Sequence, residues 1–294
     1  MTIIYLFIFV MLFIISPYFR AIIFHPVSTI YYIIKDTYLY FRYRRYNEYR
    51  KFGTLTIFNG LFGKGKTLSS TYFGRKIYKK WNNKKIYDFK EKKWKTQKIV
   101  LVSNVEIKDV PFVQLYSLTD IIKLSEYKDK DNVMTIWVVL VDEMSTQINS
   151  REYKTNFSTE LLNVMLTCRH YRMQMIGSAQ RFAHVDALVR QITSDAIECK
   201  KLWRLVEWDI YDAWTIENTS DVTKVKPKRR KAIFVKDKDF NAYDTVAVVE
   251  NFKDNVKAGK ILTDKEVLEA QGLLGESENN RANYKRRFRK KINK

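Results

Sequence analysis

The chain contains 294 residues, and its 53 Lys and Arg against 32 Asp and Glu give a formal net charge of +21 at pH 7. With 46% hydrophobic residues it can bury a substantial core, which excludes an isolated peptide, a small disulfide-stabilised module and a wholly disordered chain. Cys168 and Cys199 stand outside the spacings of zinc and redox motifs, so neither a disulfide framework nor a structural zinc site is expected. The positive charge favours a polyanionic partner such as nucleic acid, a nucleotide or anionic lipid.

The amino-terminal segment is strongly apolar. Residues 1–19 carry no charged side chain and, as a helix, extend about 28 Å, close to the thickness of the hydrocarbon layer of a membrane. They are predicted to form a transmembrane helix, with 21–34 as an interfacial piece or the second arm of a hairpin. Basic residues outnumber acidic ones between Lys35 and Lys51, which predicts that this side faces the cytoplasm. The expected localisation is therefore the membrane, single-pass or hairpin, with the rest of the chain in the cytoplasm.

Short apolar runs then alternate with helical patterns. Strands are predicted at 54–58, 99–103, 135–141 and 173–178, and helices at 68–81, 115–127 and 157–168, with a weakly structured connection at 79–98. This alternation predicts an α/β fold with a mainly parallel sheet covered on both faces. Residues 203–216 alternate instead between polar and apolar side chains, and with 232–235 they are predicted to form an antiparallel hairpin or sheet edge.

A phosphate-binding motif follows the first predicted strand. The sequence G-L-F-G-K-G-K-T from Gly60 to Thr67 has the form G-x-x-x-x-G-K-T and lies between a strand and a helix, as a Walker A motif does. Its glycines allow backbone N–H groups to converge on phosphate oxygens at a helix N-terminus. Lys66 is expected to reach the β- and γ-phosphates and Thr67 to bind Mg²⁺. The residues predicted to bind nucleotide are Gly60, Gly63, Lys64, Gly65, Lys66, Thr67 and Leu68.

The most apolar predicted strand ends in two acids, Asp142 and Glu143. Mg²⁺ in a P-loop protein is held at the carboxyl end of a neighbouring strand, so this is a candidate Walker B motif. Asp142 is predicted to orient Mg²⁺ with Thr67, and Glu143 to polarise the attacking water. An apolar strand that ends in Asp-Glu is common, and this one indicates a Walker B motif because it occurs together with a Walker A motif. The pair indicates ATP hydrolysis with Mg²⁺ rather than passive nucleotide binding.

Other polar residues complete the expected catalytic set with Lys66 and Glu143. Gln180 follows the fourth predicted strand, where many P-loop ATPases with an additional strand keep a residue that contacts the γ-phosphate or water; a surface amide fits the spacing equally well. Arg190 is the first choice for an arginine finger that reaches a neighbouring subunit's nucleotide. The other candidates for that role are Arg169, Arg172 and Arg181.

Several of these residues together resemble the zonula occludens toxin (Zot) family. The series comprises Walker A, Val102-Ser103-Asn104-Val105, the acidic strand end, Cys168-Arg169-His170-Tyr171, Gln180, Val185-Asp186 with Arg190, and Tyr243-Asp244-Thr245. The resemblance covers roughly 53–247. It implies an FtsK/HerA-like P-loop ATPase that serves in the assembly and export of filamentous phages, working as a ring of identical subunits with the nucleotide at the subunit boundary.

The resemblance leaves the biological context open. Family members commonly place the ATPase before a transmembrane helix, whereas here the apolar segment comes first. The leading hypothesis is a membrane-anchored ATP hydrolase that drives assembly or extrusion of a phage particle, with the membrane, phage coat or other assembly proteins, and DNA or a DNA–protein complex as partners. The alternatives are a DNA translocase or coupling ATPase of a plasmid or conjugative element, and a nucleotide-gated membrane scaffold without hydrolysis. DNA-stimulated hydrolysis would separate the two motors from the scaffold.

The predicted organisation divides the chain into five segments. They are a membrane anchor at 1–34, a basic juxtamembrane linker at 35–52, a P-loop ATPase core at 53–200, a β-rich extension of the ATPase domain at 201–250 and a helical or disordered basic tail at 251–294. The tail ends in a run from Arg281 to Lys294 that has basic residues and no acidic residue.

Overall fold

A computed structural model of the chain describes residues 2–130, 132–147, 159–219, 221, 224–243 and 262–272. The chain divides into two units, one formed by Met1–Glu48 with Ile86–Lys92 and the other by Tyr49–Lys85 with Lys93–Lys294. Strand β2 (Lys84–Asp88) crosses this division. The predicted boundary at 250–251 and the run from Arg281 to Lys294 lie outside the described residues.

Three helices make up most of the first unit. They are α1 (Thr2–Ile15), α2 (Pro17–Phe24) and α3 (Pro26–Tyr43), followed by the short 3-10 helix η1 (Arg44–Tyr46). The chain breaks between α1 and α2 because Pro17 has no N–H to continue a helix, while the Ser16 side chain accepts a hydrogen bond from the Phe19 N–H and starts a new one. A second break falls at His25, before Pro26.

These breaks overturn the predicted transmembrane helix and the membrane localisation that rested on it. Among the described residues, no helix has both the length and the apolar character needed to cross a membrane. Helix α1 has 14 residues, which corresponds to about 21 Å and is short of the hydrocarbon thickness. Helix α3 has 18 residues, but Lys35, Asp36 and Arg42 lie within it. Composition alone predicted a span over 1–19 because it did not register the break at Ser16-Pro17.

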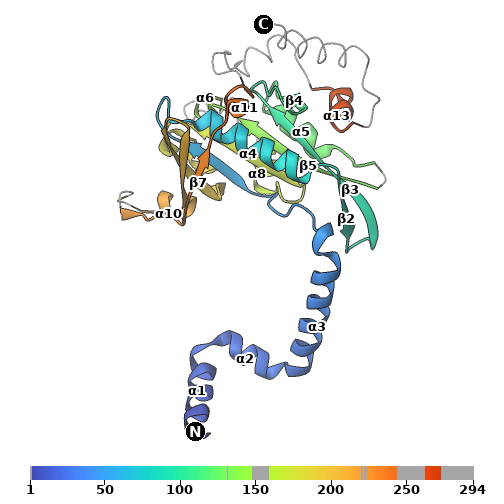
Figure 1. Ribbon diagram of the computed structural model, residues 1–294, viewed down its shortest axis with the longest axis vertical. Coiled ribbons are helices and arrows are strands. Elements are labelled where there is room, and N and C mark those ends of the chain that lie inside the picture. Colours follow the sequence, from blue (N-terminus) through green and yellow to red (C-terminus); the bar gives the residue numbers. More distant parts are fainter. Residues whose placement is uncertain are drawn as a thin grey trace. The chain divides into compact units, whose positions relative to one another are not determined.

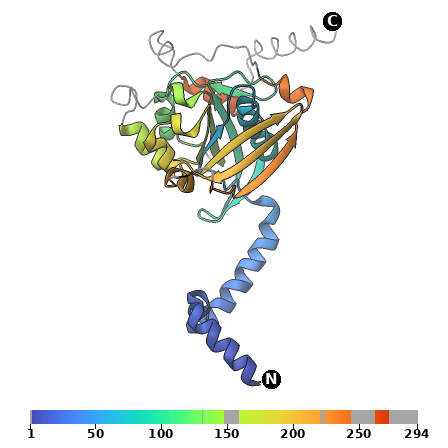
Figure 2. The same ribbon diagram turned by 90° about the vertical axis from the view of Figure 1, so that its left-hand side faces the viewer.

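The second unit is built on one sheet (Figures 1 and 2). Its strands are β1 (Leu55–Asn59), β3 (Lys93–Ser103), β4 (Phe112–Gln114), β5 (Val133–Val141), β6 (Met173–Ala179), β7 (Asp195–Leu202), β8 (Leu205–Asp212) and β9 (Arg229–Phe234). Their order is β3-β5-β6-β1-β7-β8-β9, with β4 beside β3. The strands pair in parallel from β3 to β7, whereas β7, β8 and β9 pair antiparallel.

This topology confirms the predicted α/β fold with a mainly parallel sheet and an antiparallel β-rich edge. Strand β6 lies between β1 and β5, and its register places Asn59 of β1 opposite Ala179. The predicted connection at 79–98 is wrong in part, because β2 and the first residues of β3 occupy much of it. Its lysines alternate with residues such as Trp94 and Thr96, and that strand pattern was hidden by the high charge.

Helices cover the two faces of the parallel strands. The described helices of this unit are α4 (Lys66–Trp81), α5 (Thr119–Glu126), α6 (Met144–Gln147), α8 (Thr159–Leu166), η3 (Phe182–His184), α9 (Ala187–Ile192), α10 (Ala213–Glu217), α11 (Asp237–Phe240) and α13 (Asp264–Ala270). Helix α4 packs on one face against β1, β3, β5 and β6. Its Gly74 permits this approach, since a Cβ there would lie 2.9 Å from Leu140 Cδ1.

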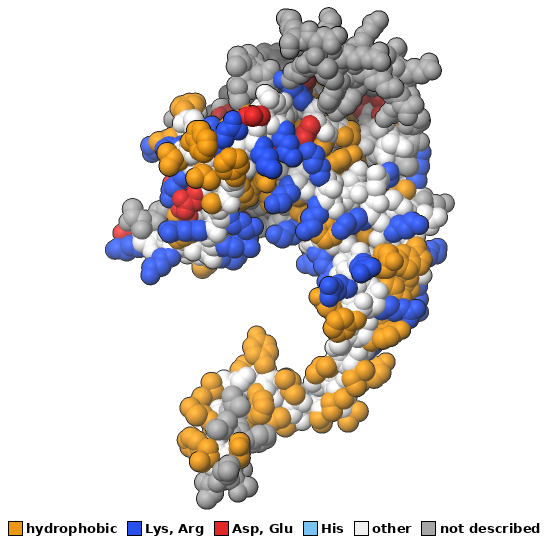
Figure 3. Space-filling view, in the orientation of Figure 1, with side chains coloured by type: hydrophobic (Ala, Val, Ile, Leu, Met, Phe, Trp, Pro, Cys, Tyr) orange, Lys and Arg blue, Asp and Glu red, His pale blue; other side chains and the backbone are white. Residues whose placement is uncertain are grey.

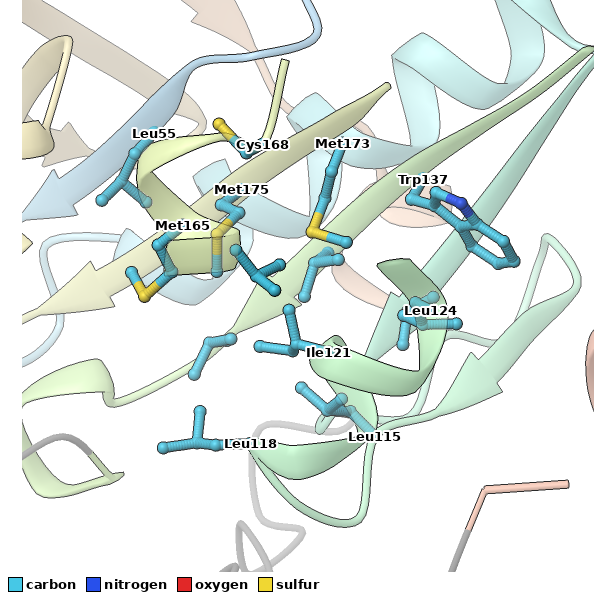
Figure 4. Close-up of a cluster of buried hydrophobic side chains, with 14 of the residues drawn as sticks. Leu55, Leu115, Leu118, Ile121, Leu124, Trp137, Met165, Cys168, Met173 and Met175 are labelled. Carbon is cyan, nitrogen blue, oxygen red and sulfur yellow. The ribbon is translucent and has the colours of Figure 1, made fainter. Parts of the chain in front are cut away.

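The opposite face carries a cluster of buried apolar side chains (Figure 4). Leu55, Met173 and Met175 project from the strands, and Ile121 of α5 and Met165 of α8 meet them from the helices. Alternate residues of β5 serve the two faces: Trp137, Val139 and Val141 belong to this cluster, while Leu140 faces α4. The sheet is therefore buried on both sides, and its carboxyl edge is left to carry polar residues.

Candidate functional site

The loop after β1 has the conformation that a phosphate cradle needs. Gly65 caps α4 with a φ of 83°, and Gly63 has a φ of 74°, values that glycine adopts without strain. A Cβ on Gly60 would lie 3.1 Å from the carbonyl oxygen of Cys199, so this glycine also allows a close approach to β7. The first N–H groups of α4 have no intrahelical partner and carry the positive end of the helix dipole. The loop can therefore receive an anion.

The side chains that are predicted to bind nucleotide have different surroundings in the structure. Lys66 is only 7% exposed, and its Nζ lies 5.6 Å from the centre of the Phe62 ring at the loop tip. Lys64 lines a pocket of about 660 Å³ beside the loop, together with residues of β7, β8 and β9. Leu68 is buried in the core, so its side chain faces away from the cradle and only its backbone can take part in binding.

Thr67 and Asp142 meet where α4 and β5 converge. The Thr67 hydroxyl lies 3.1 Å from Oδ1 and 3.0 Å from Oδ2 of Asp142, and the Ser178 hydroxyl of β6 donates to Oδ1 of the same carboxylate. Burial raises the pKa of Asp142, while the hydrogen bonds from Ser178 and Thr67 act in the opposite direction. The carboxylate is thus held by two hydroxyls in a place that disfavours its negative charge.

This pair of oxygen ligands suits Mg²⁺. In the described part of the chain no cluster of three or more His, Cys, Asp or Glu side chains is able to hold a metal ion. Mg²⁺ needs no such cluster, because it commonly takes one or two protein oxygens, keeps several waters and binds phosphate oxygens of the substrate. A hydroxyl and a buried carboxylate side by side next to a phosphate cradle match that requirement, and a cation there would offset the unfavourable burial of Asp142.

Asn104 fixes the backbone of Asp142. The Asn104 Oδ1 accepts a hydrogen bond of 2.8 Å from the Asp142 N–H, and its Nδ2 donates one of 3.1 Å to the Asp142 carbonyl. Both residues are buried. Reasoning from single motifs did not assign a role to Asn104 or Ser178. The available signal was a polar residue at the carboxyl end of an otherwise apolar strand, which at this edge of a parallel sheet marks a candidate site residue.

Glu143 has the features of a water-activating residue. Its φ is 51°, an uncommon value for a residue other than glycine that is often found at functional sites. The Glu143 N–H donates to Ser178 Oγ at 3.1 Å, while its Oε2 is buried and has no hydrogen-bond partner among the described residues. Burial raises the pKa of Glu143, and the charge of Asp142 adds to this increase, whereas Lys66 opposes it. Its carboxylate is therefore an available acceptor near the cradle.

Three further polar residues lie at the same edge of the sheet. Asn59 ends β1, and its buried Oδ1 has no partner among the residues described. Gln180 follows β6 directly and is half-buried. Burial raises the pKa of Tyr243 to about 12, with the charge of Asp142 as a second cause, which places this phenol near the carboxylate. Asn59 was not assigned from sequence, and Asp244 and Thr245 lie outside the described residues.

Arg190 is engaged within its own chain. Its Nε and Nη2 donate to the two carboxylate oxygens of Glu217 at 2.6 and 2.9 Å, and its Nη1 donates to the carbonyls of Ala183 and Val185 at 3.1 and 2.6 Å. These bonds join α9 to α10. Among the other arginine candidates, Arg172 pairs with Asp129 at 2.7 Å. A role of Arg190 in a neighbouring subunit's site stays a prediction.

Comparisons with known proteins add structural neighbours. Neither a family model nor a curated protein matches the sequence. The N-terminal domain of zonular occludens toxin from Neisseria meningitidis is 12% identical over 65% of this chain and 98% of that chain, with a TM-score of 0.43. The genome packaging NTPase B204 from Sulfolobus turreted icosahedral virus 2, in complex with ATP-gammaS, is 12% identical over 63% of this chain and 98% of that one, with a TM-score of 0.37.

The chain is thus similar to the Zot N-terminal domain and to a viral packaging NTPase. The fold itself is established by the strand order and by the loop between β1 and α4. It is a P-loop NTPase fold in which an additional strand, β6, separates the Walker A strand from the Walker B strand.

Proposed function

We propose that this protein is an ATP hydrolase that moves DNA or a DNA–protein complex during the assembly of a phage particle. The observation that carries the catalytic part is the convergence of Thr67, Asp142 and Glu143 beside the glycine loop. Thr67 contacts Asp142 through its hydroxyl. The adjacent Glu143 has a buried carboxylate oxygen, Oε2, that has no hydrogen-bond partner among the described residues. These are the parts that phosphoryl transfer to water requires.

Each residue has a distinct task in this mechanism. The backbone N–H groups of the loop and of the start of α4 bind the phosphates, and Lys66 offsets their charge. Thr67 and Asp142 would hold Mg²⁺, which when bound draws charge from the β- and γ-phosphate oxygens. Asn104 and Ser178 keep Asp142 in place. Gln180 contacts the γ-phosphate or the attacking water.

Glu143 orients the attacking water and takes up its proton. A general base works best when its pKa lies near the working pH, and burial moves the pKa of Glu143 upward from the ordinary value of 4.5. The lack of a hydrogen-bond partner at Oε2 among the described residues leaves that oxygen to accept from water. In this proposal Asp142 binds the metal and the adjacent Glu143 binds the attacking water.

The assembly role is supported by the series of residues that resembles the Zot family. By analogy with that family we propose that identical subunits form a ring, and that coat or other assembly proteins present the DNA–protein complex to it. Stimulation of ATP hydrolysis by DNA tests this role. A nucleotide-gated scaffold would show no such stimulation, and neighbouring genes for small coat-like proteins rather than a relaxase would separate phage assembly from plasmid transfer.

Nucleotide binding can be tested before any turnover. A fluorescent ATP analogue with Mg²⁺ should bind the wild-type protein, and Lys66→Ala and Thr67→Ala should weaken binding by about tenfold or more, since each removes a charge-assisted contact. Lys128→Ala, which changes an exposed lysine outside the loop, should bind as the wild type does. Equal binding by all four proteins would contradict the proposed site.

A further inference from the structure

A second pocket lies on the outer side of α4, away from the glycine loop in sequence. It has a volume of about 410 Å³ and is lined by residues of α4, β9 and α11 and their flanks. The lining residues are Tyr72, Arg75, Lys76, Lys79, Lys80, Phe234, Lys236, Lys238 and Asp239. We call this set the basic groove. In Figure 3, Lys and Arg side chains gather over this face of the protein.

The acidic residues around the basic groove are already neutralised. Arg75 is 2% exposed and bonds Asp109 through Nε at 2.6 Å and Nη2 at 2.5 Å, and Asp239 through Nη1 at 3.3 Å. Lys79 also pairs with Asp109, and Asp237 pairs with Arg204 at 2.5 Å. Arg75 and Lys79 together thus balance the two carboxylates that Arg75 bonds, so that these do not repel an anion.

Besides Lys79, which pairs with Asp109, four exposed lysines line the groove. Lys76 and Lys80 lie one turn apart on α4, while Lys236 and Lys238 come from the start of α11. The cationic surface continues onto β9, where burial lowers the pKa of Lys231, with the nearby charges of Arg229, Lys51 and Lys76 acting in the same direction. These charges come from three separate elements, α4, α11 and β9, and such a distributed set of cations suits a row of phosphates better than a single phosphate group.

Aromatic rings accompany these charges. Tyr72 stands within the groove, with Lys76 Nζ 5.7 Å from its ring centre. Phe234 is 52% exposed and meets the 71% exposed Trp203 edge to face, with the ring centres 6.0 Å apart. Exposed rings beside a cationic track are what single-stranded nucleic acid uses, because unpaired bases stack on the rings while the backbone follows the charges.

We propose that the basic groove binds a single strand of nucleic acid. Helix α4 links this surface to the candidate nucleotide site, because it begins with Lys66 and Thr67 and carries Tyr72, Lys76 and Lys80 farther along. A strand in the groove therefore contacts the same rigid element that positions the phosphate cradle. The link to hydrolysis rests on the proposed function, whereas binding of the strand does not.

Charge replacement tests the groove directly. Lys76, Lys80, Lys236 and Lys238 are replaced together by Gln, and the matched control carries Lys123, Lys128, Lys130 and Lys265→Gln, which removes the same charge from exposed positions elsewhere. Binding of a labelled oligothymidylate is followed by fluorescence anisotropy without nucleotide. The groove variant should bind at least about tenfold more weakly than the control at low salt, and the slope of log K against log salt should be smaller by about 3, as expected for four lost phosphate contacts.

The base-stacking part has its own test. Phe234→Ala should weaken binding of oligothymidylate by about fivefold or more, with little change for a duplex of equal length, because only unpaired bases can stack on the ring. A loss that is equal for both nucleic acids would contradict the single-strand assignment. Unchanged far-ultraviolet circular dichroism and melting temperature show that each variant is folded.

Several results would overturn the proposal. Equal weakening by the groove and control variants would mean that net charge alone, including the basic run from Arg281 to Lys294, holds the nucleic acid. Loss of binding to anionic vesicles of phosphatidylglycerol, with binding of oligothymidylate retained, would assign the groove to a lipid surface. Absence of ATP hydrolysis in the wild-type protein would contradict the proposed function and leave the binding result standing, so the two failures are distinguishable.

Discussion

At the scale of single residues, the candidate site concentrates acidic groups where burial opposes their charge. Asp142 and Glu143 both have raised pKa values, each with desolvation as the largest cause. A carboxyl group whose pKa is higher in the folded than in the unfolded protein makes the folded state bind more protons. Its contribution to stability is therefore present at low pH and is lost as the pH rises through the raised pKa. The protein maintains these charges at neutral pH at the expense of stability.

Asp142→Asn should reveal how much the buried charge of Asp142 lowers stability. The amide keeps an oxygen that accepts from Thr67 and Ser178 but carries no buried charge, so the melting temperature at pH 7 without Mg²⁺ and nucleotide should rise above that of the wild type. The same change should abolish the Mg²⁺-dependent increase in nucleotide affinity. Differential scanning fluorimetry and a Mg²⁺ titration measure the two effects. A lower melting temperature, with Mg²⁺ dependence intact, would show that Asp142 is a structural carboxylate.

The pH dependence of hydrolysis should report Glu143. Because Glu143 acts in its ionised form, the rate should fall on the acidic side of its raised pKa, at a pH above the ordinary value of 4.5. The rate remaining in Glu143→Gln should lack this acidic limb. Single-turnover rates between pH 5 and 8.5, taken within the stable range of both proteins, make the comparison; an identical limb in the variant would assign it to another group.

At the scale of elements, sequence patterns predicted the buried apolar strands and missed the elements and contacts that depend on the neighbouring parts of the fold. Apolar runs predicted β1, β5 and β6, and the glycine motif predicted the turn into α4. Strand β7 was missed because Glu198, Lys200 and Lys201 give it a polar character that only its place beside β1 explains. The partners of Asp142 were likewise not predicted, because Asn104 follows β3 and Ser178 lies in β6, far from Asp142 in the sequence. Sequence distance concealed these contacts.

The entry into β1 offers a test of the packing between elements. Gly53 has a φ of +79°, its N–H bonds the Met173 carbonyl, and an added Cβ would lie 2.5 Å from Arg169 Cβ. Gly53→Ala should therefore lower the free energy of unfolding by about 2–4 kcal/mol, combining the strain of a left-handed residue with steric overlap. Urea denaturation at equilibrium measures this change.

Gly272→Ala serves as the matched control. Gly272 also has a positive φ, of +67°, but nothing lies within 4 Å of an added Cβ. It should lose only the conformational part, about 1–2 kcal/mol. If both variants lose the same amount, the contact between Gly53 and Arg169 contributes nothing to the packing of β1.

At the scale of the whole molecule, the domain boundaries and the ring assembly stay predictions, and the membrane assignment was wrong. The error arose because hydrophobicity was summed over residues 1–19, a window that includes the break between α1 and the proline-started helix α2. The fold was predictable because a parallel sheet buried on both faces imposes apolar strands and polar strand ends. A single sequence does not show as clearly how subunits contact one another, because an interface is formed by surface residues whose partners belong to another chain.

Mixed assemblies test whether the nucleotide is shared between subunits. Arg190→Ala protein, inactive alone, should regain part of its hydrolysis when mixed with Lys66→Ala protein, because each supplies the group that the other lacks. Glu217→Gln breaks the same pair with Arg190 but keeps the arginine, so it should lower stability and retain hydrolysis. If the mixture stays inactive although both proteins fold and assemble, Arg190 serves only to join α9 to α10.

In the proposed mechanism Glu143 activates water at a P-loop that holds ATP and Mg²⁺. The most direct measurement is ATP hydrolysis and ATP binding by Glu143→Gln, with Glu126→Gln, an exposed glutamate at the end of α5, as the control. Glu143→Gln should bind ATP as tightly as the wild type and hydrolyse it at least about 100-fold more slowly, which is the usual contribution of a general base, while the control should match the wild type. Hydrolysis by Glu143→Gln at the wild-type rate would exclude Glu143 as the water-activating residue.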